Sequence, residues 1–331
     1  MVIPIFFCNF APRNAIKAFH APMQQLSLFD DIEPQQPSER EEILALRKEL
    51  EEQNYNYYVL SAPVMSDREF DEKMHRLEEL ERRHPELFDP KSPTQHVGSD
   101  ISEGAGLKSQ GANFEQVTHR YPMLSLANTY SEEEIREWLK RVYKGLEGTD
   151  DLDSSNSSLS TPVEIVCELK FDGLSISLWY ENGRLARAVT RGDGVRGDDV
   201  VQNIRTIPSI PQTLPASSAG TLPQTFEIRG EVLLPWSNFD RINRQREEDE
   251  EPLFANPRNA ASGTLKLLNP EVVRERGLDA YLYYVLGDNL PGTTHYERLM
   301  AAKQTGFQIS NAIRVCHSVE EVMDYIRSWS Q

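Results

Sequence analysis

Residues 167–173 read Cys-Glu-Leu-Lys-Phe-Asp-Gly and place one lysine between two carboxylates, in a run rich in strand-forming residues. Side chains of a strand alternate between its faces, so Glu168, Lys170 and, if the strand continues, Asp172 would share one face. Two interpretations are open. The row could be the solvated polar face of a half-buried antiparallel strand. Alternatively, Lys170 could be a nucleophile, because the pKa of a lysine falls readily when its amine is desolvated.

Several other polar or small-residue segments accompany this lysine. They are residues 92–98 (Ser-Pro-Thr-Gln-His-Val-Gly), 122–126 (Pro-Met-Leu-Ser-Leu), 190–194 (Thr-Arg-Gly-Asp-Gly), 229–232 (Arg-Gly-Glu-Val) and 254–263, the last expected to be a loop around Asn-Pro-Arg-Asn. From about Ser38 to the chain end, the set resembles the NAD-dependent DNA ligases of bacteria. ATP-dependent ligases and capping enzymes share the lysine motif. A helical hairpin before it and the Asn-Pro-Arg-Asn segment favour the NAD-dependent branch.

The resemblance implies an adenylation reaction. Lys170 would attack the α-phosphorus of NAD, nicotinamide mononucleotide (NMN) would leave, and AMP would pass from the lysine to a DNA 5′-phosphate for nick sealing in replication and repair. Mg²⁺ and cationic side chains would offset the phosphate charge. Asp172 would support Lys170, Arg191 would lie near the ribose and the nick, and Glu231 would contact the ribose or the metal.

The residues implied to bind NAD fall into two groups. Those near adenosine are Ser125, Leu126, Glu168, Lys170, Arg191, Glu231 and Tyr283, with Tyr283 stacked on the adenine. Those near NMN are Tyr57, Tyr58, Asp67, Phe70 and Asp71, since π faces and carboxylates suit a cationic pyridinium. Tyr58 replaces the usual histidine and Phe70 the usual tyrosine. By composition alone, Phe70 could equally be a core residue, and a tyrosine in an aromatic strand such as Tyr283 is more often core than a stacking platform.

The charge balance bears on the nucleic-acid partner. Lys and Arg number 35 against 52 Asp and Glu, a net charge of −17, which argues against a grip on nucleic acid by the whole surface but allows a local basic face. The resemblance implies that nicked double-stranded DNA is contacted by Arg258 and Lys266.

Residues 192–197 spell Gly-Asp-Gly-Val-Arg-Gly, the pattern of a dinucleotide-binding turn. The context argues against that fold, because the strands before it read as an antiparallel hairpin, a proline-rich stretch follows, and no acidic residue lies about 20 positions on. We interpret the segment as a loop in which Arg191 and Asp193 matter.

The elements that must position these residues are helices and hairpins. Serines three residues before glutamates predict helices that start after Ser38, Ser66, Ser131 and Ser318, the first two forming a hairpin over residues 38 to about 84. Strands are expected at 163–169, 174–180, 185–189, 226–234 and 281–286. This order favours an α+β fold: a helical hairpin, then a nucleotidyltransferase domain of antiparallel sheets with flanking helices.

We expect three parts: a disordered tail (1–37), a helical NMN-binding subdomain (38–100) and an adenylation domain (101–331), truncated at its C-terminal end, with a disordered loop at 148–162. The apolar start precedes Arg13, the wrong order for a signal peptide, so Met23 is the preferred initiator. The peptide from Gln25 to Phe29 resembles those that bind the bacterial sliding clamp. A chance match in a disordered start is as good an alternative.

Cys8, Cys167 and Cys316 are too far apart for a zinc motif, and their usage suits a reducing compartment. No apolar run is long enough for a bilayer, so we expect no membrane partner. The resemblance implies a cytoplasmic, nucleoid-associated bacterial protein. The family continues past this chain with a second lysine motif, an OB-fold and a zinc module. We therefore expect the N-terminal portion of a ligase. The alternatives are a catalytically incomplete NAD-binding fragment, a clamp-tethered interaction protein, or an ATP-dependent RNA ligase or capping-type transferase.

Overall fold

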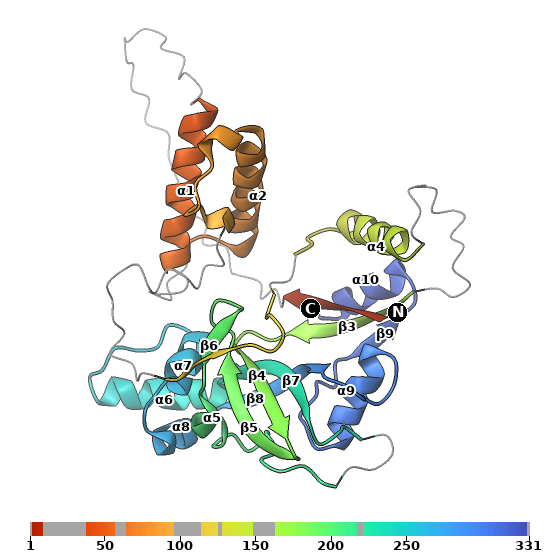
Figure 1. The fold of residues 1–331 in the computed structure, drawn as a ribbon. Helices are drawn as coiled ribbons and strands as arrows, with labels where there is room; N and C mark the ends of the chain where they lie inside the picture. Colours follow the sequence, from red (N-terminus) through yellow and green to blue (C-terminus); the bar gives the residue numbers. More distant parts are fainter. Residues whose placement is uncertain are drawn as a thin grey trace. The chain divides into compact units, whose positions relative to one another are not determined.

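The computed structural model describes residues 2–8, 38–56, 64–95, 114–124, 128–147, 163–216 and 221–329 (Figure 1). The chain divides into two compact units, one of residues 10–108 and one of residues 1–9 with 109–331. The expected loop at 148–162 and the peptide from Gln25 to Phe29 lie outside the described residues. Within the described parts, no helix is both long and apolar enough to cross a membrane.

The smaller unit is built on two antiparallel helices, α1 (Glu39–Tyr55) and α2 (Asp67–Arg83), followed by single 3₁₀ turns, η2 (Pro85–Leu87) and η3 (Pro93–Gln95). Both predicted capping boxes are present, because Ser38 and Ser66 each accept a hydrogen bond from the amide three residues on. The helices meet through a small apolar cluster of Ile43, Leu50, Leu77 and Leu80.

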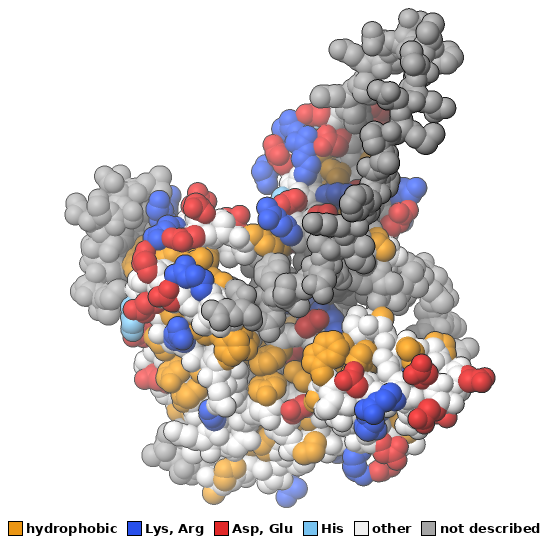
Figure 2. All heavy atoms as spheres, turned by 180° about the vertical axis from the view of Figure 1, so that it is seen from behind, with side chains coloured by type: hydrophobic (Ala, Val, Ile, Leu, Met, Phe, Trp, Pro, Cys, Tyr) orange, Lys and Arg blue, Asp and Glu red, His pale blue; other side chains and the backbone are white. Residues whose placement is uncertain are grey.

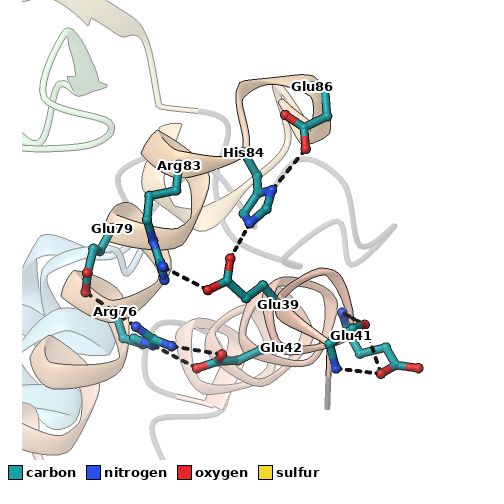
Figure 3. Close-up of polar contacts among 9 residues, drawn as sticks. Glu39, Glu41, Glu42, Arg76, Glu79, Arg83, His84 and Glu86 are labelled. Carbon is teal, nitrogen blue, oxygen red and sulfur yellow. Dashed lines mark hydrogen bonds and ion pairs between the residues drawn. The ribbon is translucent and has the colours of Figure 1, made fainter. Parts of the chain in front are cut away.

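Ion pairs reinforce the contact between the two helices. Arg76 binds the Glu42 carboxylate through Nε and Nη2, at 2.8 and 3.0 Å, and Arg83 lies 2.8 Å from Glu39. His84, just past α2, lies between Glu39 and Glu86 (Figure 3). Basic and acidic side chains are interspersed on the face of this unit that Figure 2 shows.

A four-stranded antiparallel sheet forms the centre of the larger unit, in the order β5-β4-β7-β8 (Figure 1). Its strands are β4 (Leu174–Glu181), β5 (Arg184–Thr190), β7 (Phe226–Leu233) and β8 (Asp279–Leu286). Ile176, Leu178 and Ile228 on one face join the main apolar core with residues of the helices. These helices are α5 (Val201–Ile204), α6 (Trp236–Glu248), α7 (Pro257–Leu265), α8 (Pro270–Arg276) and α9 (His295–Gln304). The other face is left for polar side chains.

A second sheet has the order β1-β3-β9, with β1 (Val2–Cys8), β3 (Glu164–Lys170) and β9 (Arg314–Cys316). Ile165 and Cys167 of β3 pack in a second core with residues of α4 (Glu132–Glu147) and α10 (Val319–Trp329). Two short strands, β2 (Gln116–Thr118) and β6 (Arg196–Asp198), pair separately. Helices and largely antiparallel sheets thus form the predicted α+β fold.

Two segments differ from the expectation. Val2–Cys8 lies in the expected disordered tail but forms β1, paired in parallel with β3 along its whole length. Its Val, Ile and Phe residues favour a strand. The expected loop at 254–263 contains helix α7, because Asn256 caps the Asn259 amide at 2.8 Å and Pro257 occupies the first helical position.

Candidate active site

The lysine motif spans the end of β3 and the turn into β4. Glu168 is buried, whereas Lys170, the last residue of the strand, is exposed. Asp172 lies beyond the strand, so it belongs to the turn and not to the strand face that was expected. Gly173 is required here, because a Cβ at this position would lie 2.2 Å from the Val232 carbonyl oxygen of β7. The turn therefore holds the motif close against the four-stranded sheet.

The polar face of the four-stranded sheet presents Glu231 to the lysine motif. Ser175 of β4 faces Glu231 of β7 in the strand register, and its hydroxyl donates to Glu231 Oε2 at 2.9 Å. Burial raises the pKa of Glu231 to about 7, although Ser175, Arg258 and Lys170 oppose the shift. The carboxyl is thus close enough to Lys170 and Arg258 for their charges to act on it.

Asp172 and Arg258 form an ion pair beside the lysine. Arg258 Nη1 lies 2.7 Å from Asp172 Oδ1, and the Asp172 side chain is 72% exposed. The charge of Asp172 also raises the pKa of Glu231. Helix α7, which carries Arg258, therefore supplies a cation to the group formed by Lys170, Asp172 and Glu231.

Aromatic side chains of β8 line the same region. The β7–β8 register shifts between Arg229, which lies opposite Tyr284, and Gly230, which lies opposite Leu282, so Tyr283 sits at the irregularity. Burial is the main cause of a raised pKa for the Tyr283 hydroxyl, and the charge of Glu231 adds to it. Tyr283 thus lies near Glu231. This position is compatible with stacking on the adenine and with core packing.

Two contacts connect the lysine motif and Arg191 to this sheet. Phe171 stacks on Tyr281, with ring centroids 4.3 Å apart and planes inclined by 11°. The Arg191 amide donates to the Ser175 carbonyl at 3.2 Å, and the Arg191 carbonyl lies 3.1 Å from His119 Nε2. Neither Ser175 nor Tyr281 was identified from the sequence, because both lie on strands whose pairing joins distant segments.

A buried polar network supports the segment before Ser125 and Leu126. Arg229 donates to Glu227 at 2.7 Å and to the carbonyls of Pro122, at 3.0 Å, and Tyr121. Ser177 donates to the same Glu227 oxygen at 2.8 Å. Ser125 and Leu126 themselves lie outside the described residues.

The glycine-rich segment 192–197 is a loop, as interpreted. The strands before it, β4 and β5, form an antiparallel hairpin, and β6 begins within it. Asp193 accepts hydrogen bonds from the amides of Arg196 and Val195, which lower its pKa. The Gly194 carbonyl accepts from the Met123 amide at 2.8 Å, so the loop also holds the 119–123 segment.

The residues expected to contact DNA and NMN lie in both units of the chain. Lys266 forms a 2.9 Å ion pair with Asp198 of β6. In the smaller unit, Phe70 packs against the apolar cluster of α1 and α2, the core alternative for this residue. Asp71 is half-buried on α2, and Asp67 begins that helix. Tyr57 and Tyr58 lie outside the described residues.

The first residues of the 92–98 segment are hydrogen-bonded to helix α2 of the hairpin. Ser92 and Thr94 both donate to the Glu81 carboxylate, Ser92 at 2.6 Å, and Arg47 lies 2.7 Å from the same group. These hydroxyls therefore anchor the segment to α2, a structural reason for a serine and a threonine at these positions.

A family model described as the NAD-dependent DNA ligase adenylation domain matches residues 111–331, which is more than half of the chain. The chain belongs to this family. A second model, the DNA ligase-like N-terminal NAD⁺-binding domain, matches residues 36–98. The adenylation-domain match contains Lys170, Glu231 and Arg258, and the second match contains the helical hairpin.

Curated relatives agree with this assignment. The chain is 59% identical to a DNA ligase of Parabacteroides distasonis over 287 residues, covering 87% of this chain and 40% of the relative. It is 53% identical to one of Bacteroides fragilis over 290 residues, with shares of 88% and 40%. For one of Thermotoga maritima the identity is 46% over 292 residues, with shares of 88% and 38%. The chain thus spans about 40% of the length of these relatives.

Proposed function

We propose that this chain transfers AMP from NAD to Lys170, the first step of DNA ligation. The amine of Lys170 forms a bond to the α-phosphorus as the bond to NMN breaks, leaving a lysine-bound AMP. The observation that carries the proposal is the grouping of Lys170 with Glu231, Arg258 and Asp172 around the end of β3. A nucleophile beside cations and a buried carboxyl suits phosphoryl chemistry.

NAD-binding roles follow the resemblance. Glu168 and Tyr283 would hold the adenine together with Ser125 and Leu126, and Glu231 and Arg191 would lie near the ribose and phosphates. The helical hairpin would hold NMN through Tyr57, Tyr58, Asp67, Phe70 and Asp71. Phe70 is partly buried against the hairpin core, so only the exposed part of its ring would be available to NMN.

Magnesium fits the site as an ion held largely by substrate phosphates. Mg²⁺ commonly takes one or two carboxylates together with phosphate oxygens and water. Glu231 and Asp172 are near enough to interact electrostatically, although the described residues contain no group of three His, Cys, Asp or Glu suited to a metal. When bound, the ion would neutralise charge on the phosphates, and Glu231 would be its protein ligand.

Later steps of ligation form the second part of the proposal. AMP would pass to the 5′-phosphate of nicked double-stranded DNA in the bacterial cytoplasm and nucleoid, with Arg258 and Lys266 on the DNA backbone. The peptide from Gln25 to Phe29 would tether the chain to the sliding clamp. If Leu28→Ala and Phe29→Ala cause no loss of affinity for the clamp, the proposed clamp binding by this peptide is wrong.

Intact mass of the full chain, measured with Mg²⁺ and NAD, ATP or neither, tests adenylation. We expect an AMP increment with NAD alone and none in Lys170→Ala. An increment with ATP but not NAD would contradict the proposed donor. The chain spans about 40% of its relatives, so a catalytically incomplete fragment is the second candidate. It would show a higher melting temperature with NAD and no increment.

A further inference from the structure

Glu168 has a specific partner far away in the chain. Its Oε2 lies 2.9 Å from His295 Nε2, and the two side chains are 3% and 7% exposed. The pair is therefore almost completely removed from solvent. A carboxylate removed from water retains its charge at tolerable cost only when hydrogen-bonded partners replace the lost hydration. His295 is such a partner for Glu168, which lies two residues before Lys170 in the sequence.

The backbone around His295 is well fixed. His295 is the first residue of α9, directly after Thr294, whose side chain and Glu297 form a capping box. Its ring lies 5.6 Å from that of Tyr284 on β8. Because Glu168 is on β3 and Tyr284 on β8, His295 joins the three-stranded sheet to the four-stranded sheet. Its position leaves the imidazole little freedom to follow Glu168 if the carboxylate rotates.

The chemistry of the pair determines what it can recognise. An ionised carboxylate only accepts hydrogen bonds, so Nε2 carries the hydrogen where it meets Oε2. Holding one carboxylate oxygen in this way orients the other. An oriented acceptor suits the 6-amino group of adenine, which donates, and disfavours the 6-oxo group of hypoxanthine, which accepts. The proposed function places Glu168 beside the adenine, as the resemblance implies.

We propose that His295 is a positioning residue that orients Glu168 to recognise the 6-amino group of adenine. The inference rests on the proposed function, because it takes NAD as the ligand. His295 itself makes no contact with the dinucleotide. It acts only through the Glu168 carboxylate, and it changes the preference for adenine over hypoxanthine.

The test compares binding of NAD with binding of nicotinamide hypoxanthine dinucleotide, measured by calorimetry on the full chain. The wild type should prefer NAD. His295→Phe keeps a ring without a donor and should lower this preference about tenfold, the range for one hydrogen bond to a charged group. His295→Gln places a donor near the position of Nε2 and should retain most of the preference. His295→Asn places its donor near Nδ1 and should not.

His317→Phe is a matched control. His317 faces Glu164 on the same strand at 3.9 Å, but both side chains are about half exposed. It should leave the preference unchanged. Glu168→Gln combined with His295→Phe should lower the preference no further than either change alone, since both act through one contact.

The outcomes distinguish a failure of the positioning role of His295 from a failure of the proposed function. Equal weakening of both dinucleotides by His295→Phe would overturn the positioning role and leave the proposed function standing. A wild type that binds neither dinucleotide would overturn the proposed function and this inference with it. If His295→Phe does not fold, the comparison of His295→Gln with His295→Asn decides, and equal preferences in these two variants would overturn the role.

Discussion

The Ser175 hydroxyl donates to the Glu231 carboxyl at 2.9 Å, across the register pair that joins β4 to β7. This is the hydrogen bond that a buried carboxyl needs, yet it does not offset desolvation, since the pKa of Glu231 is still raised to about 7. Near neutral pH the site therefore contains a carboxyl divided between its neutral and ionised forms. A cation or a cationic ligand would shift this balance towards the carboxylate.

Glu231 predicts a specific pH dependence of stability. Its pKa is about 7 when folded against an ordinary value of 4.5, so the stability it contributes is complete below pH 4.5 and is lost as the pH rises to about 7. The difference in unfolding free energy between wild type and Glu231→Gln should thus fall by about 3 kcal/mol across this range. Chemical denaturation at several pH values measures it. A difference that does not vary with pH would contradict the shift.

His84 predicts a second pH effect, in the smaller unit. Hydrogen bonds to Glu39 and Glu86 raise the pKa of His84 above its ordinary 6.5. Its stabilising contribution is therefore complete below pH 6.5 and is lost as the pH rises through the folded value. His84→Gln should remove this loss, as seen by hydrogen exchange of the peptides covering α1 and α2. His75→Gln, at an exposed position of α2, should behave as wild type.

Arg229 should be required for the stability of the larger unit. Removing its guanidinium in Arg229→Met leaves Glu227, which is 1% exposed, without its cation and frees two carbonyls of the 121–122 segment. Breaking a buried pair in this way costs about 3–5 kcal/mol. The melting temperature should fall accordingly. Arg229→Met with Glu227→Gln should recover part of the loss, and a double variant no more stable than the single one would argue against the pair.

Asp172 should matter for activity far more than for stability. Its pair with Arg258 is largely exposed, and exposed pairs are worth about 0–1 kcal/mol. Asp172→Asn should leave the melting temperature nearly unchanged while reducing AMP adduct formation at least about tenfold, which is a barrier change of about 1.4 kcal/mol. Asp324→Asn removes a comparable exposed pair with Arg327 and should alter neither quantity. Adduct formation at the wild-type rate in Asp172→Asn would remove Asp172 from the catalytic group.

Local signals in the sequence predicted much of the fold. The capping boxes at Ser38 and Ser66 are short-range hydrogen-bond patterns, and they located the helical hairpin. The small, polar composition of residues 254–263 predicts a loop, yet Asn256 followed by Pro257 is a helix start signal, and the segment forms α7. The strand Val2–Cys8 was missed because its partner, β3, lies more than 150 residues further along the chain.

The candidate site likewise contains residues that local motifs predict and residues that depend on contacts between distant segments. Lys170, Asp172 and Glu231 were identified from motifs, and the structure places them together. Ser175, Tyr281 and His295 were not, because a serine, a tyrosine or a histidine in an ordinary strand or helix gives no local sign of its distant partner. The register shift at Tyr283 likewise depends on how two strands meet, and no pattern within β8 reveals it.

The distance along the chain between Glu168 and His295 has a consequence for biosynthesis. The two residues are 127 positions apart, and a ribosome adds about 5–20 residues per second, so the histidine is made roughly 6–25 s after the glutamate. During that interval the nascent chain contains β3 without the histidine that hydrogen-bonds to its buried Glu168. The Glu168–His295 contact can therefore form only after the chain has been made as far as the start of α9.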